Sequence, residues 1–374
     1  MPALNVLHII KSLGRGGAET LLAETIRITD RVRINTHVIY FLPWKNQMVA
    51  SMQQSGAAVT CFKASNNLLI LLQVFRLRRY CREHKIDVVH YHLPWAGFAG
   101  RLLFLLARIP VVYTEHNLQE RYHFFTRILN RMTFNMQSAV IAVSDDVQKS
   151  IDRLIRPAVQ VVTILNGVNT ERFVRDSARG NTVRKEYLIP ESSVVVGTIA
   201  VFRFQKRLDA WIRIAQSLNT RYPDVYFVIV GAGPLEQSLK KQVAATSLGS
   251  KLIFPGLQTD VIPWLSMIDI YMMTSEFEGL PIALLEAMSM RCSVVATDAG
   301  GIKEVIRHRK DGLICGVHEL TQLEGFADAM IQDAHLRLAL STSGRERIVN
   351  QFSIHETVKQ IEQVYLQVTQ NQKP

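Results

Sequence analysis

The sequence is poor in the features that would place it in a secreted, metal-clustered or membrane-spanning class. Its four cysteines form no Cys-x-x-Cys pair, which excludes a zinc-finger pattern and a disulfide framework. Such sparse cysteine usage fits a reducing cytoplasm. No uninterrupted apolar run reaches the roughly 18 residues of a membrane span, because the nearest candidate contains Arg101, Arg108 and Pro110. The start, MPALNVLHII, lacks the positive segment and cleavage site of a signal peptide and predicts a strand.

The composition is that of a folded protein with more than one core. The chain has 374 residues, 48% of them hydrophobic and 20% charged, so we expect two domains. The net charge of +11 is unevenly distributed. Residues 1–166 hold 20 Lys and Arg against 10 Asp and Glu, whereas the rest of the chain is nearly balanced. This excess predicts an anionic partner for the first half: a lipid surface, an acidic acceptor or nucleic acid.

Short apolar segments alternate with helical patterns in both halves of the chain. In the first half, strands are expected at Leu4–Ile10, 37–41, 58–62 and Val88–His92, and in the segments VVYTEH and AVIAVS. In the second half, they are expected at 194–200, 225–230 and 251–254, and in IDIYMMTS and SVVATDAGG. Strands this apolar are typical of parallel sheets covered on both faces. The sequence therefore predicts an α/β protein with two Rossmann-like, doubly wound domains facing each other across a cleft.

We expect domain boundaries where the patterning weakens. The first domain should span residues 1–166 and lie on the acceptor side, and the second should span 194–353. Residues 167–193 are polar and weakly patterned, so we expect a linker there. A C-terminal helix and polar tail should occupy residues 354–374. Ligands of such folds lie at the carboxyl ends of the strands.

Two segments at strand ends could hold an anion. KSLGRGGAET, with Gly16 and Gly17, fits either a nest of backbone N–H groups or a tight strand-to-helix turn. VFRFQKRLD places Arg203 and Lys206 three residues apart, where they could clamp a diphosphate. The commoner explanation of such a pair is a solvated basic turn.

Histidines follow two of the expected strands. His116 ends a strand of the first domain, where an imidazole could bond a substrate hydroxyl. His90 and His92 lie two apart on one strand and share a face, but no third ligand is evident. The sequence therefore predicts no metal site.

The segment TSEFEGLPIALLEAM carries two carboxylates of interest. With a helix beginning near Pro281, Glu278 lies in the preceding turn and Glu286 more than one turn inside. A negatively charged helix start accounts for Glu276 and Glu278. It does not account for Glu286, which stands among Leu284, Leu285 and Ala287 and needs a partner if it is buried.

In this order on two α/β domains, these motifs resemble one family, the retaining GT-B glycosyltransferases of family 4. The resemblance runs from GRGGAE to DGLIC near Cys315, and Glu-x7-Glu followed by DAGGIKEVI is its most specific part. It implies transfer of a sugar from a nucleotide-sugar, most simply a UDP-sugar, to a glycan or lipid-linked acceptor. The setting would be the synthesis of cell-surface polysaccharide or glycolipid. GDP and ADP stay open as donor bases.

The resemblance also implies roles for particular residues. Glu286 would accept hydrogen bonds from the donor ribose, and Glu278 would lie near the transferred sugar. The backbone at Gly279 and Leu280 would lie beside sugar and phosphate. Arg203 and Lys206 would clamp the diphosphate. Gly16 and Gly17 would belong to a loop that closes over the phosphates. His116 would lie near the primary hydroxyl of the sugar. The segment AVFRFQKR departs from the family, with Val201 and Phe202 where a glycine is usual.

No Asp-x-Asp pair occurs in the chain, so we expect neither a metal nor another cofactor. Cations and helix N-termini would then meet the diphosphate charge. Retaining hydrolases use a carboxylate nucleophile, but no carboxylate of the first domain stands out as one. The resemblance implies instead that the departing diphosphate helps to deprotonate the acceptor.

The basic first half predicts where the protein works. LLILLQVFRLRRYCREHK and RYHFFTRILNRMTF combine apolar and basic residues, a pattern found on helices that lie on anionic membranes. A sheet-covering helix with a solvated basic face explains the first segment equally well. We expect an enzyme that is cytoplasmic, or peripheral on the cytoplasmic face of the membrane. Two alternatives are a non-catalytic nucleotide-sensing protein of the same fold and a nucleic-acid binder, the latter lacking any recognisable nucleic-acid motif.

Overall fold

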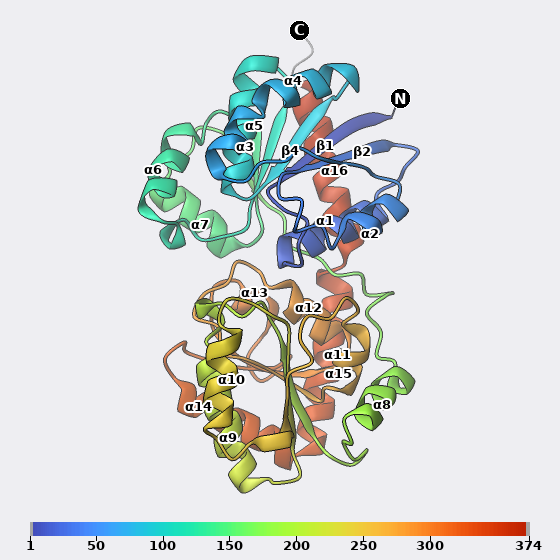
Figure 1. Cartoon of the computed structure of the whole chain (residues 1–374), viewed down its shortest axis with the longest axis vertical. Helices are drawn as coiled ribbons and strands as arrows, with labels where there is room; N and C mark the ends of the chain where they lie inside the picture. Colours follow the sequence, from blue (N-terminus) through green and yellow to red (C-terminus); the bar gives the residue numbers. More distant parts are fainter. Residues whose placement is uncertain (1–2, 372–374) are drawn as a thin grey trace. The chain divides into compact units, whose positions relative to one another are not determined.

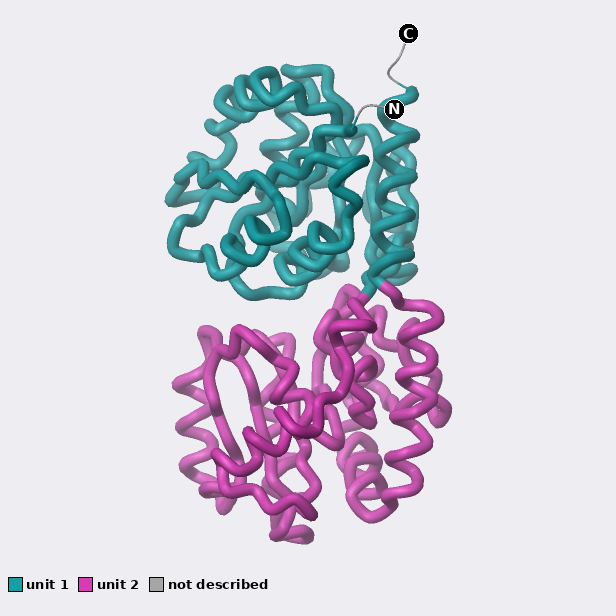
Figure 2. Tube along the Cα trace, turned by 90° about the vertical axis from the view of Figure 1, so that its right-hand side faces the viewer, with its two compact units in different colours: residues 1–167, 354–374 teal, residues 168–353 magenta. Residues whose placement is uncertain are grey.

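The computed structural model describes residues 3–371, which form two compact units (Figures 1 and 2). Unit 1 takes the chain up to Gly167 and again from Ile354, and unit 2 spans Val168–Ser353. The chain thus passes between the units twice, and a parallel bridge pairs Val168 with Ser353 next to both crossings. In the part of the chain that is described, no helix combines the length and the apolar character needed to cross a bilayer.

Unit 1 is built on a seven-stranded parallel sheet in the order β3-β2-β1-β4-β5-β6-β7. Its strands are β1 Leu4–Ile10, β2 Ile34–Tyr40, β3 Ala58–Cys61, β4 Val88–His92, β5 Val111–Glu115, β6 Ala139–Ala142 and β7 Val161–Thr163. Its helices are α1 Gly17–Ile28, α2 Val49–Gln54, α3 Asn67–Leu72, α4 Val74–Glu83, α5 Pro94–Ala107, α6 Phe124–Thr133, α7 Asp145–Leu154 and α16 Ile354–Gln370.

Helices cover both faces of this sheet, which explains why its central strands β4 and β5 are buried throughout. On one face α1 and α16 lie in contact, and Ile361, Val364 and Tyr365 of α16 join the buried cluster of the strands. On the other face α5 packs so closely that a Cβ on Gly100 would stand 2.3 Å from the Tyr91 ring. The C-terminal helix therefore completes the core of the first unit.

Unit 2 holds a six-stranded parallel sheet in the order β10-β9-β8-β11-β12-β13. Its strands are β8 Val195–Ile199, β9 Tyr226–Val230, β10 Leu252–Ile253, β11 Ile270–Met273, β12 Ser293–Thr297 and β13 Leu313–Cys315. Its helices are α8 Ser177–Glu186, α9 Leu208–Arg221, α10 Glu236–Ala244, α11 Ile262–Met267, α12 Ile282–Ser289, α13 Ile302–Val305, α14 Leu320–Gln332 and α15 Ala334–Gln351.

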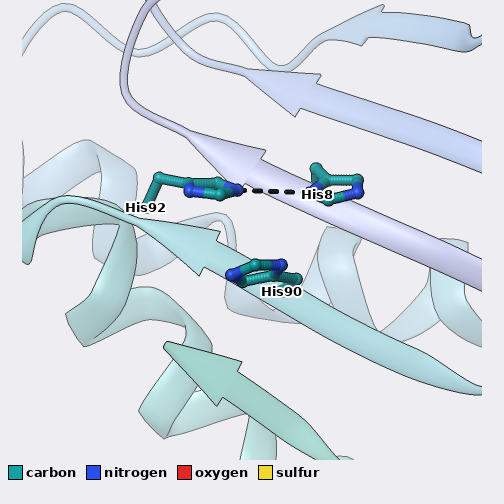
Figure 3. A group of neighbouring side chains, drawn as sticks. All are labelled: His8, His90 and His92. Carbon is teal, nitrogen blue, oxygen red and sulfur yellow. Dashed lines mark hydrogen bonds between the residues drawn. The ribbon is translucent and has the colours of Figure 1, made fainter. Parts of the chain in front are cut away.

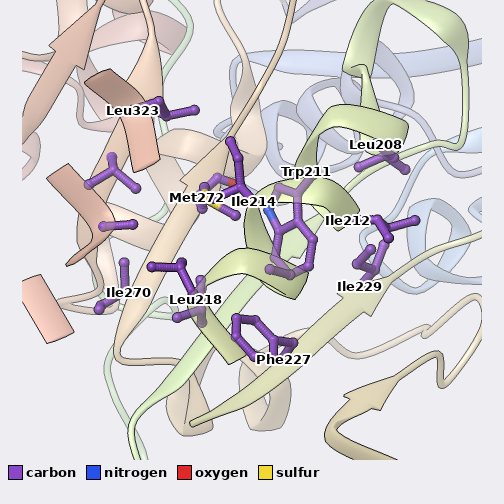
Figure 4. Close-up of a cluster of buried hydrophobic side chains, with 14 of the residues drawn as sticks. Leu208, Trp211, Ile212, Ile214, Leu218, Phe227, Ile229, Ile270, Met272 and Leu323 are labelled. Carbon is purple, nitrogen blue, oxygen red and sulfur yellow. Dashed lines mark hydrogen bonds between the residues drawn. The ribbon is translucent and has the colours of Figure 1, made fainter. Parts of the chain in front are cut away.

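The core of unit 2 is centred on the buried Trp211 of α9 (Figure 4). Its indole packs edge-on against Phe227, and its N–H donates to the Met272 carbonyl at 3.0 Å. Helix α9 is thereby held over β9 and β11. Because α9 follows the loop after β8, this packing also determines where that loop ends.

The segment 167–193, for which we expected a linker, contains helix α8 and lies within unit 2 from Val168 onward. Asp176 caps α8, and Gly180 lets it approach α11 closely, because a Cβ there would stand 2.8 Å from the Ser266 carbonyl carbon. The buried Arg184 is paired with Asp269 at 2.8 Å. These contacts rest on single polar residues, which is why the segment is weakly patterned.

Candidate active site

In both units the strand order reverses beside the first strand of the sheet. The reversal lies between β1 and β4 in unit 1 and between β8 and β11 in unit 2. In open α/β sheets ligands bind at such switch points, in the crevice outside the carboxyl ends of the strands.

A small hollow in unit 2 lies at its switch point. Its walls come from the ends of β8 and β11 and from the turn before α9, and they comprise Thr198, Ile199, Ala200, Lys206, Leu208, Met273, Thr274 and Ser275. Of the predicted site residues, Lys206 lines it directly. The crevice that the fold predicts therefore carries a cation at its wall.

Lys206 forms an ion pair with Glu278, with 2.5 Å between Nζ and Oε1. Both side chains are largely buried, at 19% and 11% exposed, so water screens the pair only in part. The Ser275 hydroxyl donates to the same carboxylate oxygen at 2.6 Å. The structure thus brings together two residues that lie 72 positions apart.

Hydrogen bonds from two hydroxyl groups and one backbone N–H hold the two loops that carry this pair. The Thr274 hydroxyl lies 2.9 Å from the Lys206 carbonyl, to which it donates. The Glu276 N–H donates to the Gln205 carbonyl at 2.7 Å, and the Thr297 hydroxyl donates to the Ser275 carbonyl at 2.6 Å. Sequence reasoning missed Thr274, Ser275 and Thr297, although the first two stand directly before Glu276.

The loop after β12 packs against the loop that carries Glu278. Gly300 adopts φ +61°, and a Cβ on it would stand 2.1 Å from the Glu278 carbonyl oxygen. The next residue, Gly301, donates its N–H to the Gly279 carbonyl at 2.9 Å. Leu280 is buried and anchors the same loop. The glycines of DAGG therefore allow the close approach that positions Glu278.

Glu286 lies on the first turns of α12, which begins at Ile282 after Pro281. Its side chain is 6% exposed. Burial raises the pKa of the Tyr271 phenol, and the nearby Glu286 carboxylate adds to the rise. Glu286 is therefore a buried carboxylate near Tyr271 of β11; it lies on helix α12, whereas Glu278 lies in the loop before that helix.

Arg203 occupies a different setting from Lys206. Its backbone is extended and its side chain is exposed, at the start of the 3₁₀ turn Phe204–Lys206. The preceding Phe202 is buried, and its ring centroid lies 6.2 Å from that of Phe254. Gly233 lies so close to Phe202 that a Cβ on Gly233 would stand 2.6 Å from the Phe202 backbone nitrogen. The departure at Val201 and Phe202 therefore builds a turn braced by the GAGP loop.

The first-unit residues end up at strand ends. Gly16 precedes helix α1, and Gly17 is the first residue of that helix. The Ser12 hydroxyl donates to the carboxylate of Glu19, which lies in the first turn of α1. His116 follows β5, and its Nε2 lies 3.5 Å from Nδ1 of His92. Burial lowers the pKa of His116 to about 4, so its imidazole is neutral near pH 7. It can then share a proton with a hydroxyl without carrying charge.

The structure supplies the third imidazole that the sequence did not reveal. His90 and His92 have a third imidazole beside them, His8 on the neighbouring strand β1 (Figure 3). The sequence offered no sign of it, because His8 lies more than 80 positions before them and only the pairing of β1 with β4 brings the three together.

Two family models match the chain, one on each half. Residues 15–172 match the model described as Glycosyltransferase Family 4, and residues 181–347 match Glycosyl transferases group 1. Together they span both units.

Curated relatives and solved structures agree with these models. The chain is 28% identical to N-acetyl-alpha-D-glucosaminyl L-malate synthase of Bacillus anthracis, over 80% of this chain and 79% of that protein. It is 26% identical to the Escherichia coli UDP-Gal:alpha-D-GlcNAc-diphosphoundecaprenol alpha-1,3-galactosyltransferase, over 79% of each. Anabaena HepE, crystallised with UDP and glucose, superposes with a TM-score of 0.87 at 20% identity, covering 97% of this chain and 100% of that one. That likeness confirms the two-unit α/β fold.

Proposed function

Because the chain belongs to the group 1, family 4 glycosyltransferases of the GT-B fold, we propose that it moves a sugar from a UDP-sugar to a glycan or lipid-linked acceptor. The observation that carries the proposal is the Lys206–Glu278 pair at the switch point of unit 2. The alternative of a non-catalytic nucleotide sensor has less support, since the relatives named above carry the names of a synthase and a transferase.

In the proposed mechanism the main task is to stabilise the departing diphosphate. Lys206 has three N–H donors, of which one is directed to Glu278 and the others are able to meet phosphate oxygens. The exposed fork of Arg203 would add a second cation, and the first turn of α1, with Gly16 and Gly17, would add backbone donors. Donors fixed before reaction give this kind of stabilisation its strength.

Glu278, Glu286 and His116 would place the sugar and the nucleoside. Glu278 is held by Lys206 and Ser275 and would meet the transferred sugar, with the backbone of Gly279 and Leu280 beside it. Glu286, buried on α12, would accept from the ribose hydroxyls. His116, neutral near pH 7, would bond the primary hydroxyl of the sugar. We propose that the diphosphate takes the acceptor proton, which gives transfer with retention and needs no metal.

A donor panel tests the proposal. The purified chain is incubated with UDP-, GDP- and ADP-sugars, and release of the nucleoside diphosphate is followed alongside thermal shift. Turnover and stabilisation with UDP-sugars are expected. The names of relatives include both a UDP-galactose and a GDP-mannose enzyme, so a response confined to GDP-sugars would overturn the donor base alone. No hydrolysis or transfer with any donor would overturn the function.

We also propose that unit 1 docks peripherally on anionic lipid, where a lipid-linked acceptor would lie. Helices α3, α4 and α6 each contact α5, and together the four expose large apolar side chains, among them Leu68, Leu72, Phe75, Leu105, Phe124, Phe125 and Met132. Residues 67–133 hold 10 Lys and Arg against 4 Asp and Glu. Apolar side chains among cations complement an anionic bilayer surface.

A further inference from the structure

Three histidines meet in the interior of unit 1, outside the proposed donor site. Strands β1 and β4 pair in parallel with His8 opposite His90, and His92 stands two residues beyond. Because side chains alternate between faces along a strand, all three imidazoles lie on the same face of the sheet (Figure 3). One ring nitrogen from each lies within 4.8 Å of the other two.

The surroundings favour neutral imidazoles. The three side chains are 4%, 1% and 6% exposed. They line a hollow whose other walls, among the described residues, are apolar or uncharged polar side chains of α1, β5, β6, α16 and the strand ends, with no carboxylate among them. A buried imidazolium there would lack a counter-charge, whereas a neutral imidazole is the form that ligates a metal.

The spacing is close to that of a metal site. Nδ1 of His8 lies 3.2 Å from Nε2 of His92. Two nitrogens on one tetrahedral zinc ion, each about 2.0–2.1 Å from it, stand roughly 3.3 Å apart. The third ring, His90, has a nitrogen within 4.8 Å of those of the other two and would move inward to complete the set.

Two of the three ligands, His90 and His92, have outer partners. His90 contacts the Tyr365 hydroxyl through Nδ1 and the Thr114 hydroxyl through Nε2, both at 2.6 Å. Whichever nitrogen turns to the ion, the other keeps a hydroxyl that fixes its tautomer. Nδ1 of His92 faces His116 at 3.5 Å. Such outer partners are a regular part of histidine metal sites.

We propose that His8, His90 and His92 form a binding site for a divalent transition-metal ion, with Zn²⁺ the best match. Three imidazoles suit Zn²⁺, Co²⁺, Ni²⁺ or Cu²⁺ and not Mg²⁺ or Ca²⁺, which require oxygen ligands. Thr25, Asn166 and Thr357, which also line the hollow, offer polar groups to a water in the fourth position. The site joins β1 to β4 and borders one proposed donor contact, His116, through His92.

The test uses the untagged full-length chain, freed of metal by dialysis against a chelator. Titration with Co²⁺ is expected to give visible d–d absorption that saturates at one equivalent and is abolished by Zn²⁺. His8→Asn and His92→Gln keep a polar atom near the lost nitrogen, and both should weaken Co²⁺ binding beyond the roughly 10–100-fold cost of losing an outer partner. His37→Asn, a half-buried strand histidine of the same unit, is the matched control and should bind as before.

Circular dichroism checks that each variant is folded. If one variant does not fold, the other variant together with the wild-type stoichiometry carries the test. Absence of a saturable one-equivalent spectrum would overturn the proposal and leave the cluster as a hydrogen-bonded group. Equal Co²⁺ affinity in wild type and a folded variant would overturn it as well.

Discussion

At the scale of single residues, the ion pair between Lys206 and Glu278 is the feature on which the proposed function mainly rests. Lys206→Ala removes the cation proposed to meet the diphosphate and leaves Glu278 with its Ser275 partner. We expect kcat to fall by about 10²–10³-fold, the usual cost of removing one donor to a developing negative charge. Steady-state kinetics and a melting curve measure this, with the exposed Lys241→Ala as control. Near-normal turnover of a folded K206A protein would contradict the assignment.

Glu286 should act on binding more than on turnover. Glu286→Gln preserves the shape of this 6% exposed side chain and removes its charge. A hydrogen bond to a charged group contributes about 1.5–3 kcal/mol, so we expect KM for the donor to rise about 10–100-fold. The change should be smaller in kcat, because the ribose takes no part in bond breaking. Isothermal titration with the nucleoside diphosphate provides an independent measurement, and an unchanged dissociation constant would refute the ribose contact.

At the scale of elements, the glycine loop after β12 determines the position of Glu278. Gly300→Ala places a Cβ on a residue with φ +61°, 2.1 Å from the Glu278 carbonyl oxygen, so the loop has to move. We expect loss of stability by about 1–3 kcal/mol and a fall in kcat, measured by urea unfolding and kinetics. Gly325→Ala on α14 is the control, since nothing lies within 4 Å of its Cβ. There alanine should be neutral or stabilise by up to about 1 kcal/mol. Equal stability of both variants would show that the loop adapts freely.

Elements whose pattern is apolar on both faces could be predicted from the sequence, and those held by a few polar contacts could not. The bounds expected for β1 and β4 agree with the structure, because both strands are flanked by other strands and buried on both sides. Strands β7 and β13, which lie at sheet edges, were missed. Each has three residues, too few to show a pattern, and β7 is also only half-buried. Residues 68–84, expected as one helix, form α3 and α4, joined at Gln73.

The candidate site follows the same division. Lys206 and Glu278 were each predicted as site residues through the family resemblance, and the structure shows that the two side chains are in contact. The hydroxyls of Thr274, Ser275 and Thr297, which orient the Lys206–Glu278 pair, were not predicted. Threonine and serine are common at strand ends, and their spacing carries no signal. His8 could not be linked to His90 and His92 before the order of the strands was known. Contacts across a sheet depend on register, and register is not visible in one strand at a time.

At the scale of the whole molecule, the charge lies on one unit, and lipid binding should therefore follow that unit. We expect co-sedimentation with anionic vesicles at low ionic strength, weakening as salt screens the cations. Reversing the exposed Arg78 and Arg131 of α4 and α6 should weaken binding more than about 10-fold, at roughly 1 kcal/mol for each basic residue lost. Reversing the exposed Arg213 and Lys240 of unit 2 changes the net charge equally and should have little effect. Equal loss in both double variants would mean that net charge alone drives the association.

No co-sedimentation at low ionic strength, or equal binding to neutral vesicles, would refute the anionic docking surface and leave transfer from the donor untouched.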